Sequence, residues 1–214
     1  MADQAATRPM RKDAARNRQL LVTAAAEAFA EQGTDVSVSE IAERAGIGKG
    51  TVFRHFTTKD DLLAAIVTEK MYRLAETGEQ LTHTQDPADA LREFMSAAIE
   101  LQIEDRAFCQ VVHGVANDHP EVHKSQERLE AVTEALTDRA RRHGVIRQDI
   151  TGQDILLLMS GIYLTASRLQ DTQPHLWRRY LRLVLDGMEA LDVPVLPGPP
   201  PLGGIATAPA SSLF

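Results

Sequence analysis

The chain is poor in the residues that disulfide-bonded and membrane-spanning proteins need. Its 214 residues include one cysteine and one tryptophan, and only 5% are aromatic. A single thiol excludes an intrachain disulfide, and no run approaches the ~20 apolar residues that span a bilayer. The N-terminus also lacks the apolar segment of a secretory signal, so we expect a cytoplasmic protein with no membrane partner.

The alternation of apolar and polar residues that marks half-buried strands is also missing. Apolar residues instead recur at helical spacing along most of the chain, and 43% of the residues are hydrophobic, enough to bury a core. The pattern predicts an all-α fold with about nine helices. The expected helices span residues 13–32, 37–45, 49–56, 59–81, 87–105, 108–116, 120–143, 151–169 and 174–191.

Acidic residues outnumber basic ones, and the net charge of −7 by itself argues against a nucleic-acid partner. The charge is unevenly distributed along the chain, however, because residues 1–60 carry a net charge of +1 and the remainder carries −8. Phosphate would repel the acidic remainder of the chain, so the N-terminal region is the part expected to approach DNA. Residues 1–12 are interpreted as a flexible basic arm whose Arg8, Arg11 and Lys12 reach phosphates or a minor groove, or else as a solubilising tail.

The segment VSVSEIAERAGIGKGTVFRHFTTKDDLL predicts two short helices joined by a tight turn, with a third helix starting directly after them. Ser37 and Glu40 have the spacing of a capping box, and Gly46 ends the first helix. Val52 and Phe56 form the inward pair of the second helix. Its outward face comprises Lys49, Thr51, Phe53, Arg54 and His55. A short, basic, hydrogen-bonding face suits a helix in the major groove of DNA.

The same segment matches the pattern A-x-x-A-G-[IV]-x-x-G-T-[LV]-[YF]-x-H-F-x-x-K-x-x-L and resembles the helix-turn-helix of TetR-type transcriptional regulators. The matching residues are Ala42, Ala45, Gly46, Ile47, Gly50, Thr51, Val52, Phe53, His55, Phe56, Lys59 and Leu62. Upstream, Leu21, Ala24, Ala25, Phe29 and Gly33 extend the match over about the first third of the chain. The alternative is an ordinary helical hairpin whose basic face is only solvated.

The resemblance implies a set of DNA contacts. Lys49 is a candidate reader of guanine, Thr51 of a base or a thymine methyl group, and Arg54 of a base or a phosphate. The expected phosphate ligands are Ser37, Ser39, His55 and Lys59. Gly50 is also expected at the DNA-binding surface. Phe53 stands where the family more often has tyrosine, so we expect only an apolar contact from it.

The domain layout also follows from the resemblance. Residues 13–58 would form the helix-turn-helix DNA-binding domain, and residues 59–191 a helical ligand-binding and dimerisation domain. The helix over 59–81 is long enough to belong to both. Residues 192–214 are rich in proline and glycine and are expected to form a disordered tail, to which we assign no function.

The last two helices are apolar on more than one face and must be covered, either by their own bundle or by a second subunit. TetR-type proteins use such a pair to form a two-fold homodimer, and a dimer reads a palindromic operator with two recognition helices. The expected interface residues are Leu158, Ile162, Leu169, Trp177, Tyr180, Leu181, Val184 and Met188.

The resemblance further implies a repressor that is released from its operator by an unknown small molecule. The sequence supports a largely apolar cavity for that molecule. Its candidate lining residues are Phe94, Met95, Phe108, Val112, His113, Leu129, Val132 and Tyr163. The alternative for each of them is ordinary core packing.

Other functions remain open from the sequence. Cys109, His113, His119 and His123 have spacings that a metal sensor could use, although no carboxylate completes the set convincingly. A Cys–His nucleophile lacks a third group and an oxyanion donor, so we expect neither an enzyme nor a bound cofactor or metal. A helical enzyme or interaction module that ignores DNA is the rival, and it predicts no salt-dependent binding to a duplex.

Overall fold

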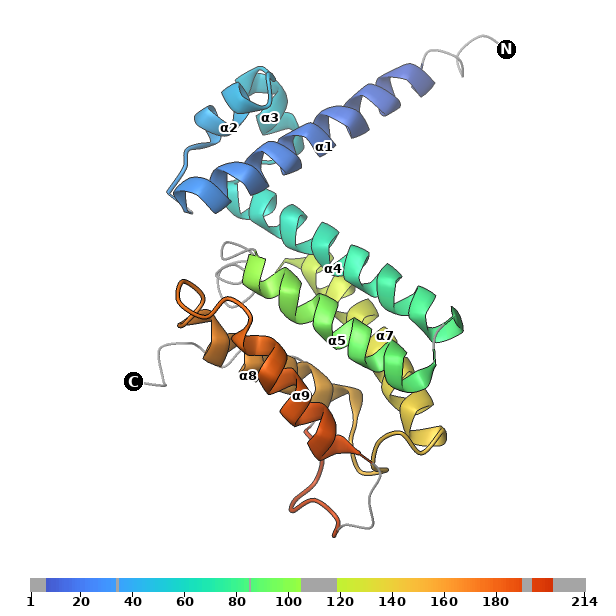
Figure 1. The fold of residues 1–214 in the computed structure, drawn as a ribbon. Helices are drawn as coiled ribbons and strands as arrows, with labels where there is room; N and C mark the ends of the chain where they lie inside the picture. Colours follow the sequence, from blue (N-terminus) through green and yellow to red (C-terminus); the bar gives the residue numbers. More distant parts are fainter. Residues whose placement is uncertain (1–6, 34, 85, 105–118, 190–193, 202–214) are drawn as a thin grey trace, which may run out of the picture. The chain divides into compact units, whose positions relative to one another are not determined.

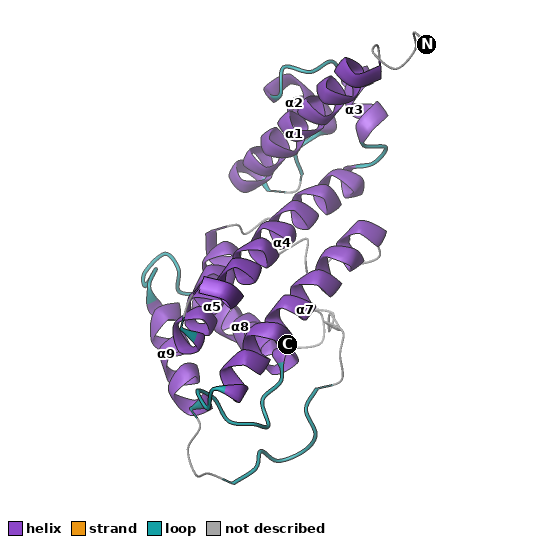
Figure 2. Ribbon diagram, turned by 90° about the vertical axis from the view of Figure 1, so that its right-hand side faces the viewer, coloured by secondary structure: helices purple, strands orange, loops and turns teal. Residues whose placement is uncertain are grey.

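A computed structural model describes residues 7–33, 35–84, 86–104, 119–189 and 194–201 of the chain. Within these ranges the chain is helical (Figure 2) and contains eight helices. Among the described residues, the one strand-like pairing is an isolated β-bridge between Ile146 and Glu189. The predicted all-α fold is therefore confirmed. The ninth helix expected over residues 108–116 lies outside the described residues.

The chain forms two compact units. The first consists of Met1–Thr68 with Arg106–Val122, and the second of Glu69–Asp105 with His123–Phe214. Helix α4 (Lys59–Thr84) contributes its first ten residues to the first unit and the rest to the second. Each unit buries its own set of apolar side chains.

The first unit contains α1 (Thr7–Gln32), α2 (Val38–Arg44), α3 (Lys49–His55) and the start of α4, and α2 contacts both α1 and α3 (Figure 1). The apolar side chains of α1 face this core. The buried side chains are Leu21, Ala25, Phe29, Val36, Ile41, Val52, Phe56, Leu62 and Ile66. Two helices as short as α2 and α3 cannot enclose a hydrophobic core alone, so α1 and α4 complete it.

Helix α1 begins at Thr7, six residues before the predicted start at Asp13. Pro9, a residue that interrupts a helix interior, falls in the first turn of this helix. The backbone N–H groups of that turn have no partner within the helix, so proline costs no hydrogen bond. The prediction of a flexible arm over residues 1–12 is wrong for residues 7–12, and residues 1–6 lie outside the described residues.

The second unit contains the remainder of α4 with α5 (Pro87–Glu104), most of α7 (Pro120–Arg142), α8 (Gly152–Ser167) and α9 (Leu176–Met188). Helices α5, α8 and α9 contact one another pairwise (Figure 1). Its buried side chains include Leu91, Phe94, Met95, Ile99, Leu136, Ile155, Met159 and Trp177. Among the helices described in either unit, none is both long and apolar enough to cross a membrane.

Gly78 is the point of closest approach in the second unit. A Cβ atom at this position would lie 2.4 Å from Cγ1 of Val132 and 2.9 Å from Cε2 of Phe94. Glycine in a helix interior costs about 1 kcal/mol relative to alanine. Here that cost lets α4 contact α5 and α7 directly.

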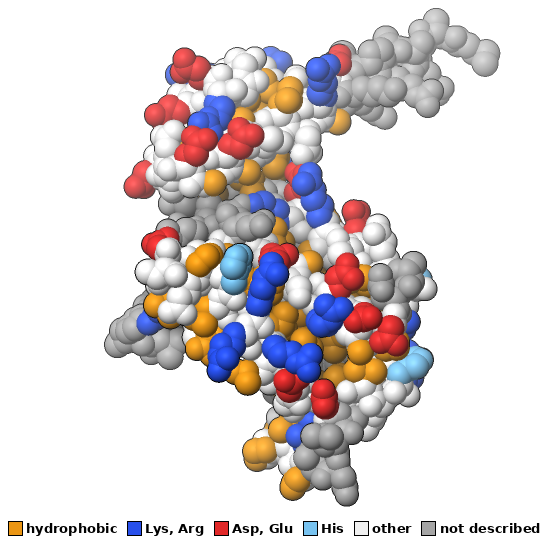
Figure 3. All heavy atoms as spheres, in the orientation of Figure 1, with side chains coloured by type: hydrophobic (Ala, Val, Ile, Leu, Met, Phe, Trp, Pro, Cys, Tyr) orange, Lys and Arg blue, Asp and Glu red, His pale blue; other side chains and the backbone are white. Residues whose placement is uncertain are grey.

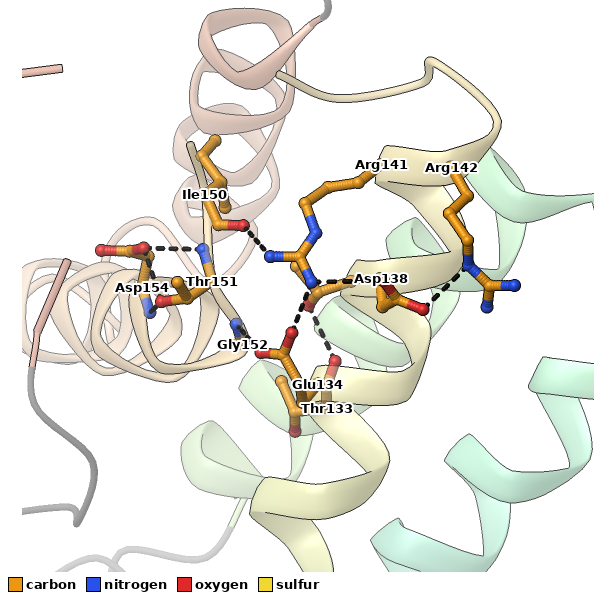
Figure 4. Close-up of polar contacts among 10 residues, drawn as sticks. Thr133, Glu134, Asp138, Arg141, Arg142, Ile150, Thr151, Gly152 and Asp154 are labelled. Carbon is orange, nitrogen blue, oxygen red and sulfur yellow. Dashed lines mark hydrogen bonds and ion pairs between the residues drawn. The ribbon is translucent and has the colours of Figure 1, made fainter. Parts of the chain in front are cut away.

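The turn from α7 to α8 is fixed by a polar network (Figure 4). Arg141 donates one hydrogen bond to the backbone carbonyl of Ile150 (3.0 Å) and another to Glu134 (2.6 Å). The second carboxylate oxygen of Glu134 accepts the backbone N–H of Gly152 at 2.6 Å. Thr151 caps α8, and its side chain accepts the backbone N–H of Asp154. The start of α8 is thereby held to α7.

Part of the C-terminal segment contacts the second unit. Arg147 donates to the backbone carbonyl of Pro194 (2.6 Å), and Asp149 accepts the backbone N–H of Leu196 (2.7 Å). The expectation of a disordered tail over residues 192–214 is therefore wrong for Pro194–Leu196. Composition indicated a chain unable to form its own core, but these residues use hydrogen-bonding partners supplied by another part of the fold.

Candidate nucleic-acid interface

The capping box predicted at the start of α2 is present. Ser37 Oγ accepts the backbone N–H of Glu40 at 3.2 Å, and Glu40 Oε2 accepts the backbone N–H of Ser37 at 2.8 Å. The hydrogen bonds with Ser37 hold the pKa of the Glu40 carboxyl below its usual value. Both N–H groups belong to a helix start that would otherwise be unsatisfied.

The turn between α2 and α3 requires Gly46. Its φ is +65°, a left-handed conformation that other residues adopt at a cost. Two backbone bonds close the end of α2: Gly46 N–H to Glu43 (3.0 Å) and Ile47 N–H to Ala42 (3.0 Å). This Schellman geometry turns the chain sharply and sets the direction in which α3 leaves α2.

Helix α3 has one buried side and one open side. Val52 and Phe56 are buried in the unit core, as the inward pair was predicted to be. Lys49, Phe53 and Arg54 are exposed, with 57% of Phe53 accessible to solvent. Thr51 and His55 are half-buried, and Gly50 is exposed. The seven residues of α3 extend over about 10 Å, a length that spans only a few base pairs of a duplex.

Three of the expected phosphate ligands flank α3 in the sequence, and they differ in exposure to solvent. Ser37 is exposed and Ser39 half-buried, both at the start of α2. Lys59 is half-buried as the first residue of α4, and its Nζ lies 5.6 Å from the centre of the Phe29 ring. Its ammonium group is thus held in place by a cation–π contact from α1.

The start of α4 is capped by Thr58. Its Oγ1 accepts the backbone N–H of Asp61 at 3.1 Å, while Asp61 accepts the backbone N–H groups of Thr57 (3.0 Å) and Thr58 (2.9 Å). Thr58, rather than Thr57, is thus the residue whose side chain caps the helix. The cap fixes Lys59 one residue later, next to the end of α3.

Two arginines that the sequence analysis missed attach α1 to the helix pair. Arg44 forms an ion pair with Glu31, which lowers the pKa of Glu31 and raises that of Arg44. The guanidinium of Arg18 lies 5.4 Å from the centre of the Phe56 ring. Partners 13 and 38 residues apart leave no local sequence signal. Figure 3 shows both acidic and basic side chains on the drawn face of α1–α3, so the unit is not uniformly positive.

Two of the four metal candidates, Cys109 and His113, lie outside the described residues. His119 Nε2 lies 3.9 Å from Asp61 Oδ1, and His119 Nδ1 accepts the backbone N–H of Glu121 at 3.3 Å. His123 is exposed. Among the residues that the structure describes, no group of three or more histidine, cysteine or acidic side chains is placed to hold a metal ion.

The ligand-lining candidates that can be located belong to the core of the second unit. Phe94, Met95, Leu129 and Val132 are buried and Tyr163 is half-buried. Phe94 and Val132 are the side chains packed against Gly78, so at that point they fill space. The other three candidates, Phe108, Val112 and His113, lie outside the described residues.

The predicted interface residues divide into two groups. Ile162, Trp177, Leu181 and Met188 are buried within the chain's own second unit, so their assignment to a subunit interface is wrong. The reason is that α5 packs on α8 and α9 and covers one apolar face of each. The remaining four are accessible: Leu158, Tyr180 and Val184 are half-buried and Leu169 is exposed.

The exposed apolar side chains that sequence reasoning missed lie on the other face of the same two helices. They are Leu157 and Leu164 on α8 and Leu183 on α9. The sequence showed that both faces of α8 are apolar, but spacing alone does not say which face meets α5. We call Leu157, Leu158, Leu164, Leu183 and Val184 the outer face of α8 and α9.

Comparison with known protein families matches two segments of the chain. Residues 21–66 match the model described as bacterial regulatory proteins of the tetR family. Residues 86–190 match the model described as the C-terminal domain of transcriptional regulators similar to SbtR. The first match contains the whole helix-turn-helix, and the second contains α5, α7, α8 and α9.

Solved structures give matches over most of the chain. The TetR transcriptional regulator SCO0520 from Streptomyces coelicolor is 32% identical, with a TM-score of 0.64 over 80% of this chain and 98% of its own. A TetR regulatory protein from Mycobacterium vanbaalenii is 29% identical, with a TM-score of 0.63 over 85% and 99%. FadR from Bacillus subtilis in complex with stearoyl-CoA shares the fold at 20% identity, with a TM-score of 0.64 over 80% of this chain and 99% of its own.

A curated relative matches a shorter stretch. An HTH-type transcriptional regulator from Staphylococcus aureus is 44% identical over 59 residues, which are 27% of this chain and 32% of that protein. The match thus spans about a third of the curated relative's length. A gamma-butyrolactone receptor described as similar to ArpA shares the fold at 21% identity, with a TM-score of 0.62 over 84% of this chain and 91% of its own.

Proposed function

The chain belongs to the TetR family of transcriptional regulators, and from this premise we propose that it is a dimeric repressor that a small ligand releases from a palindromic operator. The observation that carries the proposal is the division of α3 into a buried and an open side. Val52 and Phe56 anchor the helix in the core, which leaves Lys49, Phe53 and Arg54 exposed. An exposed helix of this size and chemistry fits the major groove.

Lys49 and Arg54 supply the base contacts in this proposal, with Thr51 between them. Lysine and arginine donate to guanine O6 and N7, and a threonine methyl packs against thymine. Ser37, Ser39, His55 and Lys59 bind phosphates and fix the position of α3 along the duplex. Phe53 contributes an apolar contact to sugar or base.

Gly50 supports a close approach between α3 and the DNA backbone. Its φ is not positive, and a Cβ atom there would meet nothing within 4 Å in the described protein. The fold therefore gives no reason for glycine, which weakens a helix by about 1 kcal/mol relative to alanine. A phosphate or sugar approaching this surface supplies one.

Two further glycines support association of subunits through the outer face. Gly161 on α8 and Gly187 on α9 are exposed, and a Cβ atom at either would meet nothing within 4 Å in the described protein. They lie among Leu157, Leu164 and Leu183, which are also exposed. A second copy packed there would bury the leucines and use the glycines for close helix contact.

The proposed ligand is small and largely apolar, and it binds within the second unit. Its candidate contacts in the described residues are Met95, Leu129 and Tyr163, while Phe94 and Val132 pack against Gly78. Relatives of the same fold include a regulator in complex with stearoyl-CoA and a gamma-butyrolactone receptor. Butyrolactones are small, and the acyl chains of free fatty acids and acyl-CoA thioesters are apolar, so these three classes are the first compounds to test.

Two experiments test this function. Binding to a random pool of duplex DNA, followed by sequencing of the bound fraction, is expected to enrich an inverted repeat. Titration of the recovered duplex with the three compound classes is expected to release DNA for at least one of them. A shift from mostly bound to mostly free requires about 5 kcal/mol of differential ligand affinity. Absence of any enriched sequence at low salt contradicts the DNA-binding role.

A further inference from the structure

A pair of charged side chains holds the C-terminal segment against the second unit. Arg147 donates from Nε to Asp149 Oδ1 (2.6 Å) and from Nη2 to Asp149 Oδ2 (2.8 Å). Each partner also binds the backbone of the C-terminal segment, Arg147 through the carbonyl of Pro194 and Asp149 through the N–H of Leu196. We call these two side chains the clasp. Bidentate arginine–carboxylate pairs are strong and geometrically defined.

The clasp lies on a turn that is itself fixed. It belongs to the α7–α8 connection, where Arg141 and Glu134 bind the backbone of Ile150 and Gly152 (Figure 4). Arg147 also donates its backbone N–H to the carbonyl of Met188 at 3.0 Å, which ties the turn to the end of α9. Anchors on both sides of the clasp mean that the position of Leu196 is defined by the fold.

Leu196 forms part of the wall of an apolar groove. The groove has a volume of about 460 Å³ and lies between α8 and α9. Its apolar lining consists of Ile150, Leu157, Leu158, Leu183, Val184, Met188 and Leu196. Four of these residues belong to the outer face of α8 and α9, so the groove and the outer face form one continuous surface. Leu196 leaves 42% of its surface in solvent.

We propose that the segment Pro194–Leu196 is part of the subunit interface, and that the clasp positions Leu196 to receive an apolar side chain from a second copy of this chain. The inference rests on the proposed dimer. Arginine and aspartate side chains that order a loop at the edge of an apolar surface extend that surface and reduce the entropy lost on association. A second copy is the occupant because the groove continues into the outer face, where Gly161 and Gly187 leave room for helices to pack closely.

The neighbouring residue gives the argument a matched control. Val195 is 81% exposed and does not line the groove. Its side chain is as apolar as that of Leu196 and belongs to the same segment. Only Leu196 is expected to matter for association, so the pair separates a specific contact from a general effect of changing the segment.

The experiment measures the dimer dissociation constant of the full chain by sedimentation velocity over a dilution series. Four variants are compared with the natural sequence: Leu196→Asp, Val195→Asp, Asp149→Ala and Leu157→Asp. We expect Leu196→Asp and Asp149→Ala to weaken the dimer about tenfold or more and Val195→Asp to change it less than about twofold. Circular dichroism of each variant confirms that the helices are retained.

The outcomes separate this inference from the dimer itself. If the natural chain is a monomer at every concentration, or if Leu157→Asp leaves the dimer intact, the proposed interface is wrong and the inference goes with it. If Leu157→Asp disrupts the dimer while Leu196→Asp and Asp149→Ala do not, the interface stands and the role of the C-terminal segment is overturned. Equal weakening by Leu196→Asp and Val195→Asp also overturns it, because the effect is then not specific to the groove.

Discussion

At the scale of single residues, Lys49 and Lys59 carry the same charge but differ in their surroundings. Lys49 is the exposed first residue of α3, whereas Lys59 is half-buried with its ammonium group over the Phe29 ring. In the proposed complex the exposed Lys49 reads a base, whereas Lys59, held beside the helix start, binds a phosphate that every sequence presents.

We therefore expect different effects from removing the two side chains. Lys49→Ala should weaken binding to the selected operator by about 1–3 kcal/mol and relax the preference at one base position. Lys59→Ala should weaken all duplexes alike and reduce the slope of log K against log salt by about 1. Fluorescence anisotropy at several salt concentrations measures both quantities.

Lys124 provides the control, since it is exposed on α7 in the second unit. Lys124→Ala removes the same charge and should leave both the preference and the salt slope unchanged. Equal losses on the operator and on a scrambled duplex for Lys49→Ala would contradict its assignment as a base reader.

Phe53 offers a substitution that adds an interaction. It is 57% exposed on the open side of α3, at a position where the TetR-type pattern given above accepts tyrosine or phenylalanine. Phe53→Tyr should strengthen DNA binding by about 0.5–1.5 kcal/mol through one added phosphate hydrogen bond. The same anisotropy assay tests this. Unchanged or weaker binding would place Phe53 away from the backbone.

At the scale of helices, the structural features predicted best from the sequence are those that depend on neighbouring residues. The capping box of Ser37 and Glu40, the turn at Gly46 and the buried pair of α3 were all predicted correctly, because each depends on residues close together in the chain. The start of α1 was missed, because proline is compatible with a first helical turn as well as with irregular chain.

Long-range packing explains the other differences. Which apolar face of α8 and α9 meets α5 depends on contacts between distant segments, so Ile162 and Trp177 were assigned to the wrong side. The clasp binds Pro194 and Leu196, each 47 positions from its partner in the chain, and the proline-rich composition of the segment did not indicate these contacts. The ion pair of Arg44 and Glu31 escaped prediction for the same reason.

Gly78 makes the packing of α4, α5 and α7 testable. Gly78→Ala places a methyl group within 2.4 Å of Val132 Cγ1, and we expect it to destabilise the fold by about 1–3 kcal/mol through overpacking. Gly50→Ala in α3 meets nothing within 4 Å and should be neutral or slightly stabilising. Urea unfolding followed by circular dichroism measures both. Equal stabilities would contradict the close approach at Gly78.

The clasp has a defined response to acid. The hydrogen bonds from Arg147, and that from the backbone of Leu196, hold the pKa of the Asp149 carboxyl far below its usual value. A carboxyl whose pKa is lower in the folded chain stabilises the fold above its unfolded pKa of about 3.9 and loses this contribution as the pH falls toward the folded value.

The melting temperature of Asp149→Asn should therefore lie below that of the natural chain by a constant amount between about pH 8 and pH 5, and the difference should shrink below about pH 4. Asp171→Asn, at an exposed site before α9, controls for the loss of one formal charge. A difference that is absent at neutral pH, or that grows in acid, would contradict the clasp.

At the scale of the whole molecule, the proposed dimer combines two α3 helices, each weakly selective for DNA sequence, into one selective DNA-binding protein. As a proposed recognition helix, the seven-residue α3 would contact too few base pairs to discriminate well, and the net charge of −7 opposes non-specific attachment to DNA. Two copies held by the outer face of α8 and α9 would read two half-sites, and the second contact would benefit from the effective concentration that the first creates.

The most direct measurement of this central claim is the sequence of duplexes that the full chain selects from a random pool at low salt. The account predicts an inverted repeat whose two halves are equivalent, and it predicts that the Lys49→Ala variant loses the preference at the same position in both halves. Enrichment of a single half-site, or of no sequence at all, would contradict it.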